Sequence, residues 1–329
     1  MSRQSRSDPR ATRLLRRLRG QVFRASRLLG QPDDPWRRRH LLDSLVPHGE
    51  RIGSGESEVL RLTVRVPYRR ANEAHGPIFP GDLVPRPSDL VAVAKIARRP
   101  SLARTKLSRL VVLDTETTGL LDRPETVPFL VGLGQFGTRA FAIEQFFMEE
   151  FEGEPRMMKS LARRMRNFRA ILSYNGNTFD LPLLRRRFAV HRLAETTWQC
   201  THWDLLPAAR QLWGRGSRSC SLTNLEREIF GFRRPGGIRE SRIPQVYYDY
   251  LGGRRSERLA AVFDHNAQDI LTTAALAIVL ARTLRDPKAA VARRIADQPG
   301  LTRFLENAGG GGIARPRRRN RTGRTLRAN

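Results

Sequence analysis

Cysteine is scarce in this chain, since Cys200 and Cys220 are the only two among 329 residues. Cys200-Thr201-His202 places two soft metal ligands close together, but no second Cys-x-x-Cys or His-x3-His cluster follows. A structural zinc site with its usual four ligands is therefore not expected. We interpret both cysteines as packed thiols, and so few of them in a chain of this length also fit a reducing compartment.

Long apolar runs are lacking as well. The longest helical apolar run, at 274–281, is far shorter than the roughly 20 residues that span a bilayer. No apolar segment typical of a signal peptide lies near the N-terminus, so secretion is not expected. These absences predict a soluble, cytoplasmic protein without a membrane span.

Acidic residues are outnumbered, with 60 Lys and Arg against 32 Asp and Glu and a net charge of +28. Residues 1–40 hold twelve Arg and three acids, and residues 310–329 hold seven Arg and no acid. A GC-rich genome explains Arg in place of Lys, of which there are four, but not the excess over acids. Arg-rich segments gain affinity for phosphates by releasing counterions, so this balance favours a nucleic-acid partner.

The two basic ends differ in pattern. Near the N-terminus an apolar stripe at helical spacing predicts a basic amphipathic helix, formed by Leu14, Leu18, Val22, Ala25 and Leu29. It could lie on nucleic acid, lie on an anionic membrane or dock on the core, and docking is the default because such stripes usually pack. The glycines at 309–312 and the arginines after them predict a hinge and a disordered basic arm. We divide the chain into a basic extension (1–45), an accessory strand and loop region (46–105), a main domain (106–285) and a helical end with an Arg-rich tail (286–329).

An apolar run that ends in two carboxylates is the most informative motif. Val111-Val112-Leu113 is followed by Asp114-Thr115-Glu116 and then by the turn residues Thr117-Thr118-Gly119. Residues alternate sides along a strand, so Asp114 and Glu116 share a face at its end. Two acids placed in this way favour a bound cation, although solvated acids also end many strands.

Two later motifs add further acids. A short apolar strand at 170–174 runs through Asn175 and Phe179 into Asp180, which is expected to start a helix. In a strongly helical segment opening near Asp264, His265 and Asp269 are four residues apart and so lie on one helix face. Taken singly, Asp180 could be a first-turn charge and His265 part of an exposed pair.

The four carboxylates, with a histidine one turn before the last, resemble the DEDD (DnaQ-like) exonuclease superfamily of ribonuclease H-like fold. Between the motifs, residues 202–210, 219–226 and 243–250 resemble the YprB-type ribonuclease H-like exonuclease domain, and the resemblance covers about 106–285. Two features depart from the family. Three residues separate His265 from Asp269, as in the tyrosine-type branch, and residues 236–242 lack the acidic turn that often precedes Ile243-Pro244.

The resemblance implies a metal-dependent 3′–5′ exonuclease. It places Asp114 as a bridging ligand, Glu116 and Asp269 on one ion, and Asp180 in the outer sphere of the other. The chemistry of the residues agrees, because two Mg²⁺ ions supply a nucleophile and charge stabilisation for phosphodiester hydrolysis and prefer carboxylate oxygens. Mn²⁺ would fit the same ligands. His265 is the candidate general base, since histidine exchanges protons near neutral pH.

The expected fold is α/β, with a mixed central sheet flanked by helices. Strands are expected at 109–114, 128–135, 139–147 and 170–174, helices at 155–168 and 180–189, and a mostly helical remainder. Three strands, a helix and a strand match the ribonuclease H-like layout. The alternation at 60–66 predicts a further half-exposed strand.

Candidate nucleic-acid contacts are Thr117, Leu120, Asn175 and Phe179. Leu120 resembles the apolar residue that wedges beside the terminal base in related exonucleases. Phe179, Trp203 and Tyr247 are candidate stacking platforms, although aromatics at motif edges usually belong to the core.

The prediction is therefore a 3′–5′ exonuclease of single-stranded DNA or RNA, with Asp114, Glu116, Asp180 and Asp269 as the ion site. Two alternatives stay open: a non-catalytic nucleic-acid-binding module of the same fold, and a structure-selective endonuclease. The sequence leaves any protein partner unknown, and it does not choose between DNA and RNA.

Overall fold

The fold is organised around one seven-stranded mixed sheet with the strand order β1-β2-β5-β4-β3-β6-β7. A computed structural model describes residues 35–68, 86–96, 99–121, 123–193, 200–213, 219–231, 233–234, 237–254 and 258–285. The apolar stripe at 14–29 and the Arg-rich arm lie outside the described residues. The division of the chain into four regions stays a prediction.

The strands and helices alternate over residues 154–213, and the other strands of the sheet precede this stretch. The strands are β1 (Glu50–Ile52), β2 (Val59–Pro67), β3 (Leu110–Thr117), β4 (Pro128–Phe136), β5 (Ala140–Met148), β6 (Ala170–Ser173) and β7 (Thr201–Asp204). The helices are α2 (Pro35–Leu45), α3 (Pro87–Ile96), α4 (Pro100–Ala103), α5 (Glu154–Met165), α6 (Asp180–Val190), α7 (Leu206–Trp213), α8 (Leu222–Leu225), α9 (Ile243–Leu251) and α10 (Arg258–Arg285).

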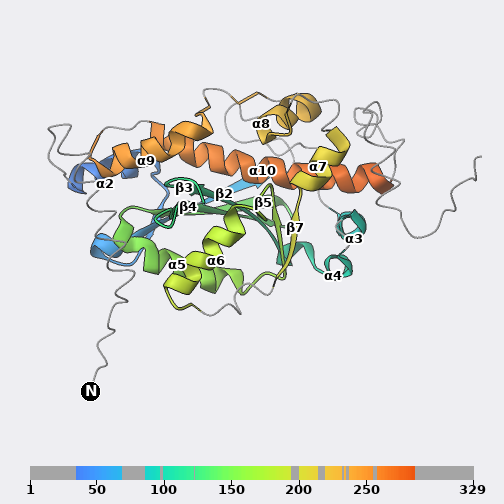
Figure 1. Cartoon of the computed structure of the whole chain (residues 1–329), viewed down its shortest axis with the longest axis horizontal. Helices are drawn as coiled ribbons and strands as arrows, with labels where there is room; N and C mark the ends of the chain where they lie inside the picture. The colour runs from blue at the N-terminus through green and yellow to red at the C-terminus, as the bar shows by residue number, and fades with distance from the viewer. Residues whose placement is uncertain are drawn as a thin grey trace, which may run out of the picture.

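The central strand β3 is buried on both faces, which explains its continuous apolar run. It pairs antiparallel with β4 and parallel with β6, so the sheet is mixed. Leu110 and Val112 belong to a core shared with α10, whereas Val111 and Leu113 belong to a core shared with α5 and α6. Figure 1 shows α10 along one face of the sheet and α5 and α6 across the other. The expected α/β architecture, a mixed sheet flanked by helices, is thus confirmed.

The accessory strand expected at 60–66 is present as β2, which pairs along its whole length with β5. The short strand β1 pairs with β2 in turn. Both strands therefore extend the central sheet on the side away from β6.

Two sequence predictions need correction. Residues after 190 were expected to be mostly helical, but Thr201–Asp204 form β7, a parallel edge strand on β6. Four residues are too few for a periodic pattern, and the neighbouring strand supplies the hydrogen bonds. The C-terminal helix begins at Arg258 rather than near Asp264, so the His265 motif lies in its second turn. Within the described parts of the chain, none of the helices has the length and apolar character needed to cross a membrane.

Candidate active site

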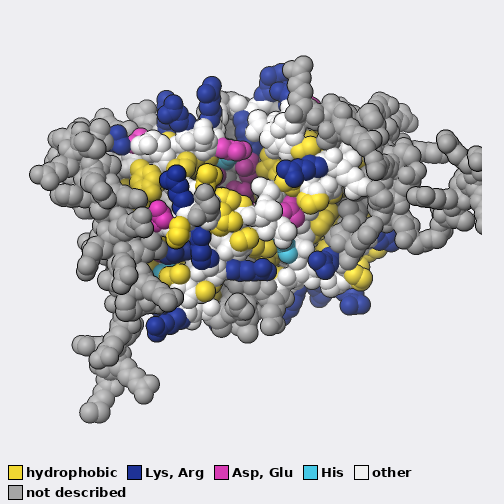
Figure 2. Space-filling model, viewed as in Figure 1, with side chains coloured by type: hydrophobic (Ala, Val, Ile, Leu, Met, Phe, Trp, Pro, Cys, Tyr) yellow, Lys and Arg dark blue, Asp and Glu magenta, His cyan; other side chains and the backbone are white. Residues whose placement is uncertain are grey.

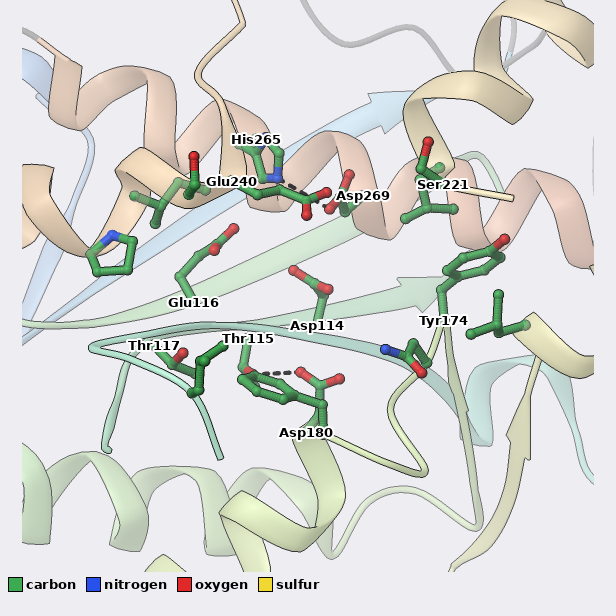
Figure 3. A pocket seen from close by; sticks show the side chains of 18 of the residues that line it. Asp114, Thr115, Glu116, Thr117, Tyr174, Asp180, Ser221, Glu240, His265 and Asp269 are labelled. Atoms are coloured by element: carbon green, nitrogen blue, oxygen red, sulfur yellow. Dashed lines mark hydrogen bonds and ion pairs between the residues drawn. The ribbon is translucent and has the colours of Figure 1, made fainter. Parts of the chain in front are cut away.

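A cavity of about 830 Å³ opens where β3 ends, between α10 and the start of α6. Figure 3 shows Asp114, Glu116, Asp180 and Asp269 converging from these elements, and Glu240 entering from the turn before α9. In the space-filling view a hollow on this face holds Asp and Glu side chains, with Lys and Arg around it (Figure 2). The cavity brings together every predicted site residue: Asp114, Glu116, Thr117, Leu120, Asn175, Phe179, Asp180, His265 and Asp269.

β3 supplies two carboxylates on the face that packs against α10. Asp114 and Glu116 continue the side of the strand on which Leu110 and Val112 are buried. Glu116 is only 9% exposed, and within the described residues no hydrogen bond or ion pair joins its carboxylate to another side chain. A buried carboxylate without a donor is costly unless a cation joins it.

Asp180 lies on the other side of β3. The Thr115 hydroxyl, which points away from Asp114, donates to the Oδ1 atom of Asp180 (Figure 3). Asp180 is the first residue of α6, as the sequence predicted, and α6 is tied to α5 by a buried ion pair between Arg187 and Glu154. The third acid is thus held by a threonine that lies between the two acids on β3.

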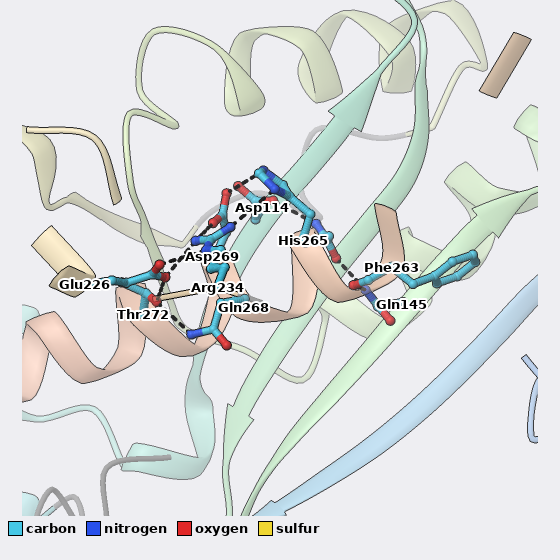
Figure 4. A network of polar contacts seen from close by, with 10 residues as sticks. Asp114, Gln145, Glu226, Arg234, Phe263, His265, Gln268, Asp269 and Thr272 are labelled. Carbon is cyan, nitrogen blue, oxygen red and sulfur yellow. Dashed lines mark hydrogen bonds and ion pairs between the residues drawn. The ribbon is translucent and has the colours of Figure 1, made fainter. Parts of the chain in front are cut away.

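α10 supplies His265 and Asp269, whose Nε2 and Oδ2 atoms are 3.3 Å apart, as their spacing of four residues predicted. Between them lies Asn266, which is fully buried. Its Nδ2 donates to the Oδ2 of Asp114 at 2.8 Å, and its Oδ1 accepts from the Nε2 of Gln145 at 2.9 Å. Gln145 also donates to the carbonyl of Phe263, so Asn266 is held in one orientation (Figure 4).

A glycine makes room for this contact. Gly132 on β4 lies directly opposite Asp114 in the β3–β4 register. A Cβ atom there would lie 2.2 Å from the Oδ1 of Asn266 and 2.3 Å from the Cδ1 of Ile270. The missing side chain therefore lets α10 approach the sheet closely enough for Asn266 to reach Asp114.

Sequence reasoning missed an arginine behind Asp269. Arg234 makes two 2.7 Å contacts with the carboxylate of Glu226, and it also donates to Asp269 (Figure 4). Its Nη1 lies 3.3 Å from the Nδ1 of His265. A guanidinium can only donate, so Nδ1 accepts and the ring hydrogen is on Nε2, facing Asp269. The Thr272 hydroxyl donates to Glu226 and completes the network.

The two sides of the site differ in their electrostatics. Loss of hydration raises the pKa of Asp114 and of Glu116 well above the usual range, and the charges of Asp269 and Asp180 add to the effect. Burial also raises the pKa of Asp180 to about 6, against the hydrogen bond from Thr115. For Asp269, burial acts in the same direction, but the contacts with His265 and Arg234 outweigh it and lower its pKa.

These features fit a divalent cation at Asp114 and Glu116, because two carboxylates deprived of water repel each other there without a positive partner. Among the described residues, no three or more His, Cys, Asp and Glu side chains are arranged so that they could hold a metal ion as they stand. Asp269 is bound to Arg234 and Asp180 to Thr115. Cation binding at all four acids would therefore require those two contacts to rearrange.

The loop between β6 and α6 is shaped by Asp204 at the end of β7. Asn175 has a left-handed backbone with φ of 66°. Asp204 Oδ1 accepts from the amides of Asn175 and Leu206 at 2.8 and 3.0 Å, and Oδ2 accepts from Asn177 at 3.0 Å. Asp204 thus sets the path of the chain into Asp180.

The candidate stacking residues fall into two groups, those in the core and those that line the cavity. Trp203 and Tyr247 are buried core residues, and Tyr247 stacks on Phe129 with ring centres 4.1 Å apart. Phe179 is half-buried and lines the cavity, while Leu120 is 66% exposed at its mouth. Cys200 and Cys220 are free, half-buried thiols.

A family model described as the RNase_H superfamily matches residues 111–281, the region that contains β3, the acids and α10. The chain belongs to the RNase H superfamily. Over 179 residues it is 27% identical to the uncharacterized protein YprB of Bacillus subtilis strain 168, an alignment that covers 54% of this chain and 43% of the relative. The expected YprB-type RNase H-like domain, which is a nuclease-type domain, is thereby confirmed. The match spans less than half of the relative's length.

Proposed function

We propose that this RNase H-like domain is a metal-dependent 3′–5′ exonuclease that hydrolyses single-stranded ends of DNA or RNA. The observation that carries the proposal is the pair Asp114 and Glu116, a half-buried and a buried carboxylate that have no ion-pair partner among the described residues. Structural carboxylates are normally paired when they lose their hydration. Acids left in this state at the base of an open cavity favour a site that is completed by a cation.

Asp114, Glu116, Asp180 and Asp269 would hold two Mg²⁺ ions, or Mn²⁺, which would supply a hydroxide nucleophile and stabilise charge on the phosphate and the leaving oxygen. The chain's own residues hold these ligands in place. Asn266 aims Asp114, Thr115 aims Asp180, and Arg234 keeps Asp269 ionised.

His265 is our proposed base for the attacking water. Its Nδ1 accepts from Arg234, so the ring can take up a proton only after that contact opens. If a cation displaced Arg234 from Asp269, the guanidinium would be free to move away from the Nδ1 atom of His265.

Substrate contacts are proposed for Thr117, Leu120, Asn175 and Phe179, which line the mouth and wall of the cavity. The exposure of Leu120 supports a contact with a base, because a large apolar side chain at a cavity mouth can pack against an unpaired base. Polarity and preference for single strands rest on the resemblance to DEDD exonucleases, and the cytoplasm stays the expected compartment on the low cysteine content.

One observation favours a second candidate, a nucleic-acid-binding module without activity. Arg234 already neutralises Asp269, as an internal cation would in a site that has lost its metal.

The test is degradation of 5′-labelled single-stranded DNA and RNA with Mg²⁺, Mn²⁺ or EDTA, comparing the parent with Asp114→Ala. Metal-dependent ladders shortened from the 3′ end, absent in the variant, support the exonuclease. Tight binding without cleavage favours the binding module, and internal cuts favour a structure-selective endonuclease.

A further inference from the structure

A second cavity, of about 680 Å³, lies beside the edge strand β7. All four residues of β7 line it, together with residues of α4, α6 and α7. The loop that leads into Asp180 separates it from the acidic cavity, since Asn175 lines the acidic cavity and Asn177 lines this one. The short stretch 175–177 therefore divides the two spaces.

The second cavity carries positive charge that is not used within the fold. Arg99 and Arg185 line it and are exposed, and neither has an ion-pair partner in the part of the chain that the structure describes. Elsewhere many arginines are paired, as Arg187 is with Glu154 and Arg164 with Glu144. Two unpaired guanidiniums over one cavity indicate that it receives an anion.

The acid in the cavity does not cancel this charge. Asp204 is the one carboxylate among its described lining residues, and its two oxygens already accept three backbone N–H groups. Burial lowers the pKa of His202, the charge of Asp204 raises it, and the charges of Arg185 and Arg99 both lower it. The charges of both guanidiniums therefore act on the space in front of β7.

The neighbouring side chains are suited to hydrogen bonding with phosphate oxygens. Asn177 is exposed, and Ser101 and Thr201 present hydroxyls that contact each other at 2.8 Å. A guanidinium binds phosphate through a planar fork of donors. The cavity thus combines charge with donors of the right geometry.

We propose that this cavity binds a backbone phosphate of the strand whose end lies in the acidic cavity. The inference rests on the proposed function for the identity of that strand. Asn175 and Asn177 are two residues apart, at most about 7 Å along the chain. A strand that leaves the acidic cavity across this loop would reach Arg185 and Arg99 within a few nucleotides.

The test measures binding apart from hydrolysis. Full-length Asp114→Asn protein is titrated in Mg²⁺ against fluorescent oligothymidylates, a dinucleotide and a decanucleotide, by anisotropy at several salt concentrations. The same measurement is made with Arg185→Gln and with Arg99→Gln/Arg185→Gln. The matched control is Arg139→Gln, which removes an exposed charge from the β4–β5 turn, a part of the sheet that β3 and β6 separate from β7. Circular-dichroism melting checks that each variant is folded.

The expected result is a loss of affinity for the decanucleotide of about three- to tenfold in the double variant, with dinucleotide binding and the control unchanged. The negative slope of log K against log salt should become shallower by about 0.7 for each phosphate that is no longer neutralised by an arginine. Unchanged decanucleotide binding, or equal losses of affinity for both lengths, overturns the proposal.

A hydrolysis assay with the protein that has native Asp114 distinguishes failure of the phosphate site from failure of the proposed exonuclease. Cleavage by this protein together with unchanged binding in the arginine variants overturns the phosphate site and leaves the exonuclease standing. Length-dependent loss of binding in the arginine variants, without cleavage under any metal, supports the phosphate site and contradicts the exonuclease.

Discussion

The carboxylates of the site belong to two groups that differ in how their charge is balanced. On β3, Asp114 has one amide donor, and Glu116 has no hydrogen-bond or ion-pair partner among the described residues. On α10, Asp269 contacts both Arg234 and His265. Burial raises the pKa of the aspartate on the strand, whereas the contacts with His265 and Arg234 lower the pKa of the aspartate on the helix.

Under the proposed function, this difference indicates which half of the site would depend on an added cation. The β3 acids are destabilised by one another in the metal-free protein, whereas Asp269 is stable without metal because the protein supplies its counter-charge. Glu226, only 1% exposed, in turn balances Arg234. Substitutions can therefore alter one half of the site at a time.

Among single substitutions, the largest expected effect on stability comes from Arg234→Gln. The change leaves Glu226 and Asp269 buried without their cation, and breaking such a pair costs about 3–5 kcal/mol. Urea unfolding in EDTA measures the free energy. The control is Arg61→Gln, which breaks an exposed pair with Glu50 and should cost less than about 1 kcal/mol. Equal losses in the two variants would show that Asp269 does not depend on Arg234.

The β3 half should make stability depend on pH. Asp114, Glu116 and Asp180 have raised pKa values, so the folded protein holds protons that the unfolded chain has released above about pH 4. Stability in EDTA is therefore expected to fall as pH rises from about 4 through 6, by about 3 kcal/mol for Asp180 alone. Saturating Mg²⁺ should remove much of this decline. A stability that rises with pH over this range in EDTA would contradict the raised pKa values.

Gly132→Ala should disturb how Asp114 is held. The new methyl group would meet Asn266 and Ile270, and overpacking of this kind costs about 1–3 kcal/mol. The control is Gly237→Ala, where the added carbon would lie 3.5 Å from the Cβ of Arg234, an ordinary contact distance. Thermal melting compares the two, and a Gly132→Ala protein as stable as the control would rule out close packing of α10 at this point.

The smallest effect on stability is expected for Leu120→Ala, within about 0.5 kcal/mol, because the side chain is 66% exposed. If Leu120 contacts the terminal base, the Michaelis constant for single-stranded DNA should rise several-fold. Val91→Ala is the matched control, since Val91 is also a large exposed apolar residue, at 45%, on α3. Equal constants for the two variants would remove Leu120 from the substrate contacts.

Most of the sheet and the four acids could be predicted because each depends on a local pattern. β3 is an apolar run that ends in acids, and His265 and Asp269 share a helix face by their spacing. The partners that tune these acids could not be predicted in this way. Arg234 lies 35 residues before Asp269, and Gln145 lies 121 residues before Asn266, so no spacing rule connects them.

One signal for the close packing was present in the sequence. Gly132 and Gly134 are two residues apart in β4, so both lie on the face that meets Ile270 of α10. Glycines two apart within a strand suggest the close approach of another element. β7 had no comparable signal, since its four residues depend on pairing with β6.

The most direct measurement is a Mn²⁺ titration followed by electron paramagnetic resonance, comparing the parent with Asp114→Asn at neutral pH. The matched control is Asp43→Asn, which removes an exposed carboxylate on α2 instead. A cation held by the β3 acids predicts saturable binding that weakens at least about tenfold in Asp114→Asn, roughly 1.4 kcal/mol, and stays unchanged in the control. Equal Mn²⁺ affinity in all three proteins, or no saturable binding in the parent, would contradict a metal site at Asp114 and Glu116.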